Sequence, residues 1–239
     1  EPLLWGKAVS ANRYGYLWGR EEEVQGSPDP SYIQGLINDR LLPGNALDVM
    51  TVPMLGYNTD WSWDASDRTY YDTPDGLENS PTYGHAETRF RMKPLGGNQF
   101  EQTTHTWNSW FNTWVPDTQR IVEGDRLFAL RADYVDEWVD FVTRTTTTLQ
   151  QHDVEYFQIW NEAYPTSGFW EGGLDDYMQR VHLPAAQAIH SLGGKVVYGG
   201  WADGGGVAYG NVIDHYIDTL DAWDAWDSID VLDVHYSTL

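Results

Sequence analysis

The chain has 239 residues, of which 41% are apolar, and it carries 36 acidic against 14 basic side chains, a formal net charge of −22. This charge excludes a nucleic-acid binder, which needs a basic surface, and it disfavours binding to an anionic membrane. The sequence contains no cysteine, so disulfides and thiolate metal sites are excluded as well.

Short apolar strands alternate with amphipathic helices along most of the chain. Strands are predicted at residues 8–14, 48–56, 154–160, 195–200 and 229–235. Helices are predicted at residues 31–42, 133–149, 174–192 and 212–223. Pro184 lies inside the third of these helices and predicts a kink or a break there. Strands that alternate with helices are typical of a parallel α/β fold.

Residues 57 to about 130 interrupt this alternation with a long, polar segment rich in aromatic residues. We expect a loop insertion, and a loop of this length in a compact domain is usually functional. Many of the 13 tryptophans and 15 tyrosines of the chain lie beside Gly, Asn, Asp or Ser, as in residues 107–114. Rings held in polar loops suit the alternately apolar and hydroxylated faces of sugars. Any single ring can equally close a gap in a loop-rich fold.

A glutamate follows the strand predicted at residues 154–160, in the motif Trp160-Asn161-Glu162. In barrels the carboxyl ends of the strands face the active site. Cleavage of a glycosidic bond needs a carboxyl group that protonates the leaving oxygen, and a retaining enzyme needs a second one about 5–5.5 Å away. Glu162 is therefore a candidate general acid/base, and Asn161 can hydrogen-bond a sugar hydroxyl or orient the carboxyl group.

This motif resembles the acid/base motif at the end of strand 4 in clan A glycoside hydrolases, and its flanks are most similar to family 39. The similarity extends to the neighbouring helices and strands, at residues 11–14, 54–61, 134–139, 176–189, 195–200 and 229–236. It covers most of the chain apart from residues 62 to about 130. The resemblance implies a (β/α)8 TIM barrel, of which strands 2 to 6 are recognised.

The resemblance also implies roles for residues at other strand ends. His235 and Tyr236 match the His and Tyr of strand 6 that approach the nucleophile and the sugar, and Arg13 matches an Arg that supports the nucleophile. Trp61 and Trp201, which each follow a strand, are candidate platforms for a sugar ring, and Trp170 is a weaker candidate. We therefore expect the following residues around Glu162: Arg13, Trp61, Asn161, Trp201, His235 and Tyr236.

The nucleophile of this clan lies at the end of strand 7, whereas this sequence stops at Leu239, just past strand 6. Strands 7 and 8 are therefore absent from the predicted domain, a partial catalytic barrel over residues 1–239. Three explanations stay open. The chain is a fragment, another chain completes the barrel, or a rearranged fold supplies its own second carboxylate, for which Asp203 is the candidate within the chain.

We expect a secreted glycosidase that cleaves an oligo- or polysaccharide by retaining double displacement. It needs no cofactor and no metal, since the seven histidines have no metal-ligand spacing. An inverting enzyme, with carboxylates about 6.5–9.5 Å apart, is one alternative. A non-catalytic carbohydrate-binding barrel is another. The Asp-rich, Lys-poor composition favours a halophilic protein over an ordinary acidic one. Apart from the carbohydrate, we expect neither nucleic acid nor a membrane as a partner.

Overall fold

The computed structural model describes residues 11–71, 79–80, 84–85, 88–164, 169–203 and 212–236. Its centre is a sheet of five parallel strands: β1 (Ala11–Leu17), β2 (Met50–Gly56), β9 (Tyr156–Ile159), β10 (Lys195–Asp203) and β11 (Val231–Tyr236). The strands follow one another across the sheet in the order in which they occur along the chain. Within the described part of the chain the sheet is open, with β1 and β11 as its edges. The prediction of a parallel α/β fold is therefore confirmed.

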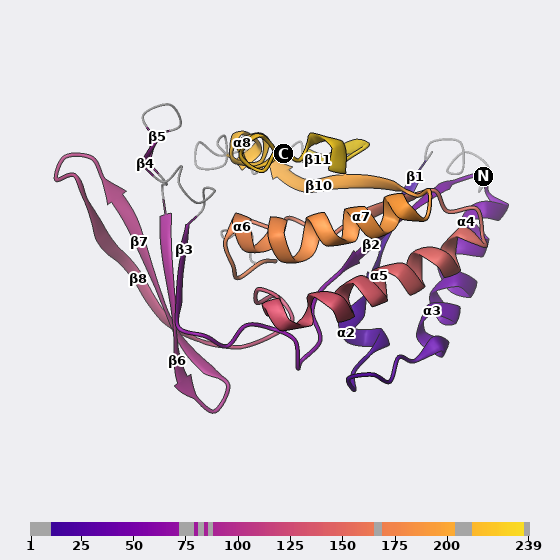
Figure 1. Cartoon of the computed structure of the whole chain (residues 1–239), viewed down its shortest axis with the longest axis horizontal. Coiled ribbons are helices and arrows are strands. Elements are labelled where there is room, and N and C mark those ends of the chain that lie inside the picture. Colours follow the sequence, from indigo (N-terminus) through magenta and orange to yellow (C-terminus); the bar gives the residue numbers. More distant parts are fainter. Residues whose placement is uncertain are drawn as a thin grey trace, which may run out of the picture.

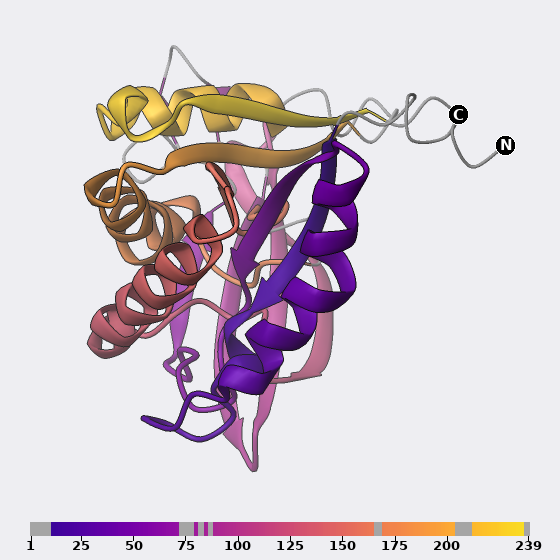
Figure 2. The ribbon, with the colours of Figure 1, turned by 90° about the vertical axis from the view of Figure 1, so that its right-hand side faces the viewer.

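Helices connect the parallel strands and pack along the sheet (Figures 1 and 2). Between β1 and β2 lie α2 (Trp18–Glu21), α3 (Pro30–Leu36), η1 (Ile37–Leu41) and α4 (Leu42–Ala46). Before β9 lie η2 (Ala132–Tyr134) and α5 (Val135–Gln150). Before β10 lie α6 (Leu174–Tyr177), η3 (Met178–His182) and α7 (Leu183–Ser191). Before β11 lie α8 (Val212–Ala222) and η4 (Trp226–Ser228). No helix among the described residues is long and apolar enough to cross a bilayer.

Two of the predicted helices contain a π-helical turn instead of a simple kink. η1 ends one residue before Leu42-Pro43, and η3 ends one residue before Leu183-Pro184. Proline has no N–H to give to the carbonyl four residues earlier, and its ring crowds that carbonyl. A π-turn ahead of the proline lets the helix continue in both places. The break predicted at Pro184 is therefore a local widening of the helix.

The insertion contains regular structure, so the expectation of a loop from residue 57 to about 130 was wrong. It contains an antiparallel sheet in the order β3 (Arg68–Tyr71), β6 (Thr88–Gly96), β7 (Gln99–Asn108) and β8 (Thr113–Glu123). A two-stranded pair, β4 (Asn79–Ser80) and β5 (Gly84–His85), accompanies it. One face of the larger sheet has a small core of Tyr70, Phe90, Met92, Phe100 and Phe128. Most other side chains of these strands are polar and at least partly exposed, so the sequence lacks a clear period of two.

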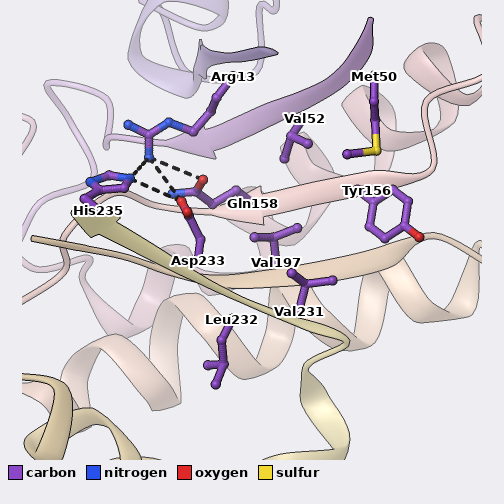
Figure 3. A pocket seen from close by; sticks show the side chains of 10 residues that line it. All are labelled: Arg13, Met50, Val52, Tyr156, Gln158, Val197, Val231, Leu232, Asp233 and His235. Carbon is purple, nitrogen blue, oxygen red and sulfur yellow. Dashed lines mark hydrogen bonds and ion pairs between the residues drawn. The ribbon is translucent and has the colours of Figure 1, made fainter. Parts of the chain in front are cut away.

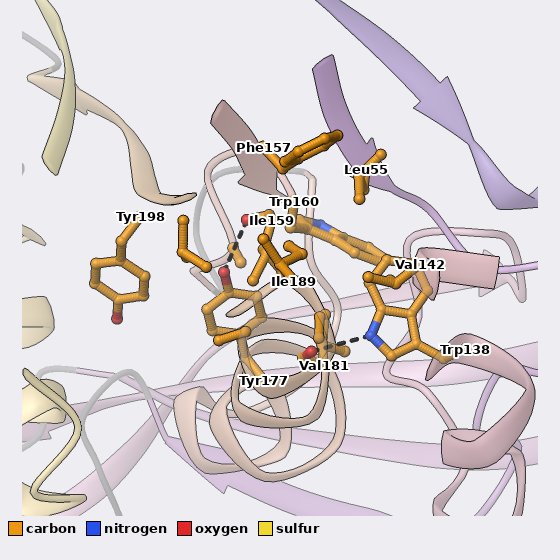
Figure 4. Close-up of a cluster of buried hydrophobic side chains, with 14 of the residues drawn as sticks. Leu55, Trp138, Val142, Phe157, Ile159, Trp160, Tyr177, Val181, Ile189 and Tyr198 are labelled. Atoms are coloured by element: carbon orange, nitrogen blue, oxygen red, sulfur yellow. Dashed lines mark hydrogen bonds between the residues drawn. The ribbon is translucent and has the colours of Figure 1, made fainter. Parts of the chain in front are cut away.

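The main core lies between the parallel sheet and the helices (Figure 4). Alternate residues of β9 and β10 point into it, because successive side chains of a strand face opposite sides of the sheet. Two of its large side chains donate to backbone carbonyl oxygens. Tyr177 Oη donates to the oxygen of Ile159 at 2.9 Å, and Trp138 Nε1 donates to the oxygen of Val181 at 3.0 Å.

Two buried carboxylates after β1 share one arginine. Arg144 Nη2 of α5 lies 3.4 Å from Glu21 Oε1 and 3.2 Å from Glu22 Oε2. Glu22 also accepts bonds from Trp18 Nε1 at 3.1 Å and from the amide of Gly26 at 2.7 Å. Burial raises the pKa of Glu21 from 4.5 to about 7, although Arg144 opposes this shift. At neutral pH, Glu21 is therefore close to half protonated.

We expect Glu21→Gln to reduce the pH dependence of stability. Because the pKa of Glu21 is higher in the folded state, the folded protein binds more protons between about pH 4.5 and 7. The stabilisation that Glu21 contributes is thus full below pH 4.5 and is lost as the pH rises to about 7. The variant should lose about 2–3 kcal/mol less free energy of unfolding between pH 5 and 8 than the wild type. Urea titrations at the two pH values measure this, with the exposed Glu23→Gln as the matched control. Equal losses in wild type and Glu21→Gln would contradict it.

Candidate functional site

The face of the parallel sheet opposite the core lines a hollow of about 570 Å³ (Figure 3). At one end of the hollow the lining is formed by Met50 and Tyr156. At the other end four polar side chains converge from β1, β9 and β11: Arg13, Gln158, Asp233 and His235. Glu162 contacts this polar group through His235.

The backbone after β9 turns sharply to place Glu162. The amide of Trp160 donates to the oxygen of Leu55 on β2 at 2.7 Å, and the Trp160 ring is fully buried. Trp160 has φ +61° and Glu162 has φ +47°, both in the left-handed region. Such a conformation costs a non-glycine residue about 1–3 kcal/mol, and it is enriched at functional sites. Here the burial of Trp160 holds the turn that directs Glu162 to the other strand ends.

Glu162 and His235 form a direct hydrogen bond. Nδ1 of His235 lies 2.9 Å from Oε1 of Glu162, whose side chain is 15% exposed. Nε2 of the same imidazole lies 3.2 Å from Oδ2 of Asp233 and 2.6 Å from Nη1 of Arg13. A protonated Nε2 donates to Asp233, whereas only a bare Nε2 can accept from Arg13. These two contacts therefore belong to different charge states of His235.

The electrostatics favour the charged imidazole. The hydrogen bond to Asp233, followed by that to Glu162, raises the pKa of His235 above 6.5, although burial and the Arg13 charge oppose the shift. The bond from His235 in turn lowers the pKa of Asp233. The two shifts agree, and both favour the imidazolium form of His235, which donates to the two carboxylates. Arg13 then faces Asp233 as an ion pair at 3.6 Å.

Arg13 connects β1 to the strand end that bears Glu162. Its Nη1 donates to Oδ1 of Asn161 at 2.8 Å and to Oε1 of Gln158 at 3.3 Å. The amide nitrogen of Gln158 donates to the oxygen of Trp160 at 2.8 Å. Asn161 is buried, so its side chain is held between Arg13 and the turn.

The structure brings together four of the residues predicted from sequence: Arg13, Asn161, Glu162 and His235. Their roles stay predictions. Sequence reasoning missed Gln158 and Asp233. A signal existed for both, because each lies two residues before a predicted strand-end residue and each interrupts an apolar strand.

The tryptophans predicted to be sugar platforms are placed less favourably for contact with a sugar. The Trp61 ring packs edge-on against Trp18 at 5.3 Å and against Tyr134 at 5.2 Å, and its Nε1 donates to the oxygen of Glu22 at 3.3 Å. Trp170 is fully buried. Both rings thus make the contacts of packing residues. The side chains of Trp201, Asp203 and Tyr236 lie outside the described ones, although their backbones belong to β10 and β11.

Gly200 of β10 allows the sheet to approach the site closely. It has φ +79°, and a Cβ atom there would lie 2.8 Å from Nε2 of Gln158 and 3.1 Å from Oδ1 of Asn161. The amide of Glu162 would be 3.3 Å away. A residue without a side chain is therefore needed next to the turn.

The described residues do not supply a paired carboxylate for Glu162. The carboxylate of Asp233 is linked to that of Glu162 only through the two nitrogens of His235. The imidazole therefore lies between the two carboxylates. Among the described residues, no group of three or more metal-ligating side chains could hold a metal ion.

Comparison with known proteins adds little to this description. No protein-family model matches the chain, and no curated protein matches it. Two solved structures of morphinone reductase in complex with tetrahydroNAD, one of them of a mutant enzyme, are similar at 10% identity. Their TM-scores are 0.36 and 0.32, with 82% and 73% of this chain covered. The chain spans about half the length of these structures, 53% and 44%. Similarity this weak carries no argument about the site.

We expect Gly200→Ala to destabilise the protein by about 2–4 kcal/mol. The added methyl group would crowd Gln158 and Asn161, and alanine disfavours the positive φ of this position. Gly96→Ala is the matched control, since Gly96 also has a positive φ, +91°, but nothing within 4 Å of its Cβ position. Urea denaturation compares the two. Equal losses of stability in the two variants would mean that the side chains of Gln158 and Asn161 move away from the added Cβ atom without a free-energy cost.

We expect Asp233→Asn to lower the pKa of His235, because it removes the hydrogen-bonding carboxylate charge that favours the imidazolium. An NMR titration of the imidazole resonances, with the Hε1 signal of His235 assigned from a His235→Gln variant, measures the shift. Asp230→Asn on the same chain segment is the control, since Asp230 contacts His190 instead. An unchanged pKa of His235 in Asp233→Asn would contradict the assigned hydrogen bond.

Proposed function

We propose that the chain carries the acid/base half of the active site of a retaining glycoside hydrolase, with its open sheet as part of a (β/α)8 barrel. The observation that supports this most is the placement of Glu162. A partly buried carboxylate follows a parallel strand, in a turn with two left-handed residues, and His235 of β11 binds it while Arg13 of β1 binds its neighbour Asn161. The carboxyl ends of parallel strands are where such enzymes hold their catalytic carboxyl groups.

In the proposed reaction, Glu162 acts twice. It first gives the proton on one carboxyl oxygen to the glycosidic oxygen as the bond to the anomeric carbon breaks. It then takes a proton from the water that releases the sugar from the enzyme. His235 donates to Oε1, which leaves Oε2 as the oxygen that exchanges the proton. The bond from His235 also fixes the orientation of the Glu162 carboxyl group.

The residues around Glu162 have positioning roles in this proposal. Arg13 holds the side-chain oxygen of Asn161, and Asn161 also forms a side-chain hydrogen bond with Tyr57, so both neighbours fix the orientation of its amide group. Gln158 supports the turn through the oxygen of Trp160. Asp233 orients the imidazole of His235.

The nucleophilic carboxylate of the proposed enzyme comes from outside the described residues. Asp233 is the described carboxylate linked to Glu162, and an imidazole separates the two. The hollow face of the sheet is consistent with further strands, because apolar side chains such as Met50 and Val231 are exposed on it. A further segment or another chain that covers this face would complete the barrel and bring the second carboxylate.

A non-catalytic carbohydrate-binding protein is the second candidate. The absence of a directly paired carboxylate within the described part of the chain favours it. A sugar site built from Arg13, Asn161 and Glu162 could bind hydroxyl groups without cleaving the chain. Measured activity distinguishes the two candidates.

We expect Glu162→Gln in the full-length protein to reduce turnover of unactivated glycosides by about 10²–10⁴-fold, because no acid remains to protonate the leaving group. Glu162→Ala should lose less with an aryl glycoside whose leaving group departs without a proton. Added azide should then release the sugar as a glycosyl azide of retained configuration, since this anion needs no general base.

Glu155→Gln is the matched control, because Glu155 precedes the same strand and pairs with Lys195 at the opposite end. Unchanged turnover in Glu162→Gln would refute the assignment. A loss that azide does not rescue would reduce Glu162 to a structural role.

A further inference from the structure

The tip of the β7–β8 hairpin presents two aromatic rings to solvent. Trp110 is 93% exposed and Phe111 is 76% exposed. Oδ1 of Asn108 accepts the amide hydrogens of Trp110 at 3.0 Å and of Phe111 at 3.2 Å, and Asn112 adopts φ +49°. Side-chain caps of this kind fix the turn. Two large apolar rings are thus held outward by a defined backbone.

More rings continue from the tip onto one face of the antiparallel sheet. Trp107 and Trp114 form a cross-strand pair with centroids 5.4 Å apart, and Tyr71 lies 5.8 Å from Trp114. The guanidinium of Arg89 lies 5.3 Å from the centre of the Trp114 ring. The small core of the sheet is made by a separate group of residues that includes Phe90 and Phe100. The rings of this face are therefore not part of that core.

The charge of this region differs from that of the whole chain. Residues 102–116 contain no Asp, Glu, Lys or Arg, although the chain has a net charge of −22. Burial and the Arg89 charge lower the pKa of His105, so this histidine is neutral at pH 7. Amide and hydroxyl groups of Asn108, Ser109, Asn112 and Thr113 separate the rings.

This composition matches an uncharged, hydroxylated partner. Nucleic acid and anionic membranes are repelled by the charge of the protein. Aromatic rings are also enriched at the centres of protein–protein interfaces, but Ser is depleted there, whereas here Ser109 and further amide and hydroxyl side chains stand between the rings. Sugar rings offer apolar faces for the aromatic rings and hydroxyl groups for the amides between them.

We propose that the aromatic ridge, defined as Tyr71, Trp107, Trp110, Phe111 and Trp114, binds an uncharged polysaccharide chain. The antiparallel sheet lies at the end of the molecule toward which β10 points (Figure 1). The carboxyl ends of the parallel strands, and with them Glu162, face the same end. The ridge shares no residue with the group around Glu162, and its binding of the polymer requires no catalysis.

Affinity gel electrophoresis tests the proposal, with xyloglucan, glucomannan, arabinoxylan or galactan in the gel. The full-length protein should be retarded by at least one of these polymers. Trp110→Ala/Phe111→Ala should bind that polymer at least about tenfold more weakly, equivalent to 1.4 kcal/mol. Leu95→Ala is the matched control, because Leu95 is an exposed apolar residue (47%) near the other turn of the same sheet. Thermal melting confirms that the variants are folded.

Three outcomes would overturn the proposal: no retardation by any of the four polymers, equal retardation of wild type and the double variant, or binding to phosphatidylcholine vesicles that the double variant loses. The proposed activity is tested separately. Glu162→Gln should keep the retardation while turnover is lost, and the double variant should keep its turnover of a short aryl glycoside.

Discussion

The amide of Trp160 donates to the carbonyl oxygen of Leu55 immediately before the chain reaches Glu162. This bond ties the end of β9 to β2, while the indole ring packs edge-on against Trp170 and Tyr57. Burial of so large a ring contributes a few kcal/mol, comparable with the cost of the left-handed conformations that follow it. The core therefore stabilises a backbone turn that the residues at the site could not hold alone. Rigidity of the candidate site derives from the sheet beneath it.

Scarce cations are concentrated where the two parts of the chain meet. The sequence has 11 arginines and three lysines against 36 acids. Arg120 of β8 lies 3.3 Å from the carboxylate of Glu171, and Nη2 of Arg68 donates to the backbone oxygen of Glu171 at 2.9 Å. Arg180 of η3 reaches Asp64 at the start of the insertion at 3.1 Å. Partly buried pairs are screened less by salt than exposed ones. These contacts can therefore hold the insertion against the α/β part despite the repulsion expected from a net charge of −22.

Much of the α/β part is predictable from sequence, because its strands and helices bury one side and so carry a regular apolar period. The strands of the insertion are not predictable in this way. Along β8 almost every side chain is at least partly exposed, so its sequence has no alternation of apolar and polar residues that would indicate a strand. Glu162 is predictable because a strand and its motif are adjacent in sequence. The contact of Asp233 with His235 additionally requires the side-chain geometry at the end of β11. The packing of Trp61 against Trp18 could not be predicted from sequence, because a tryptophan in a polar segment packs on whichever residues the fold brings near it.

The proton on His235 links the charge of the site to its hydrogen-bonding capacity. When Nε2 is protonated, Asp233 is its acceptor and the nearby Nη1 of Arg13 must draw back from it. The Nη1 group then donates more fully to Asn161, whose amide nitrogen stays directed away from Arg13. When Nε2 is bare, Arg13 divides its hydrogens between His235 and Asn161, and the hold on Asn161 weakens. A site with these contacts is best ordered when His235 is charged. Its ligand should therefore bind most tightly below the raised pKa of this histidine, and its affinity should fall as the pH passes that value.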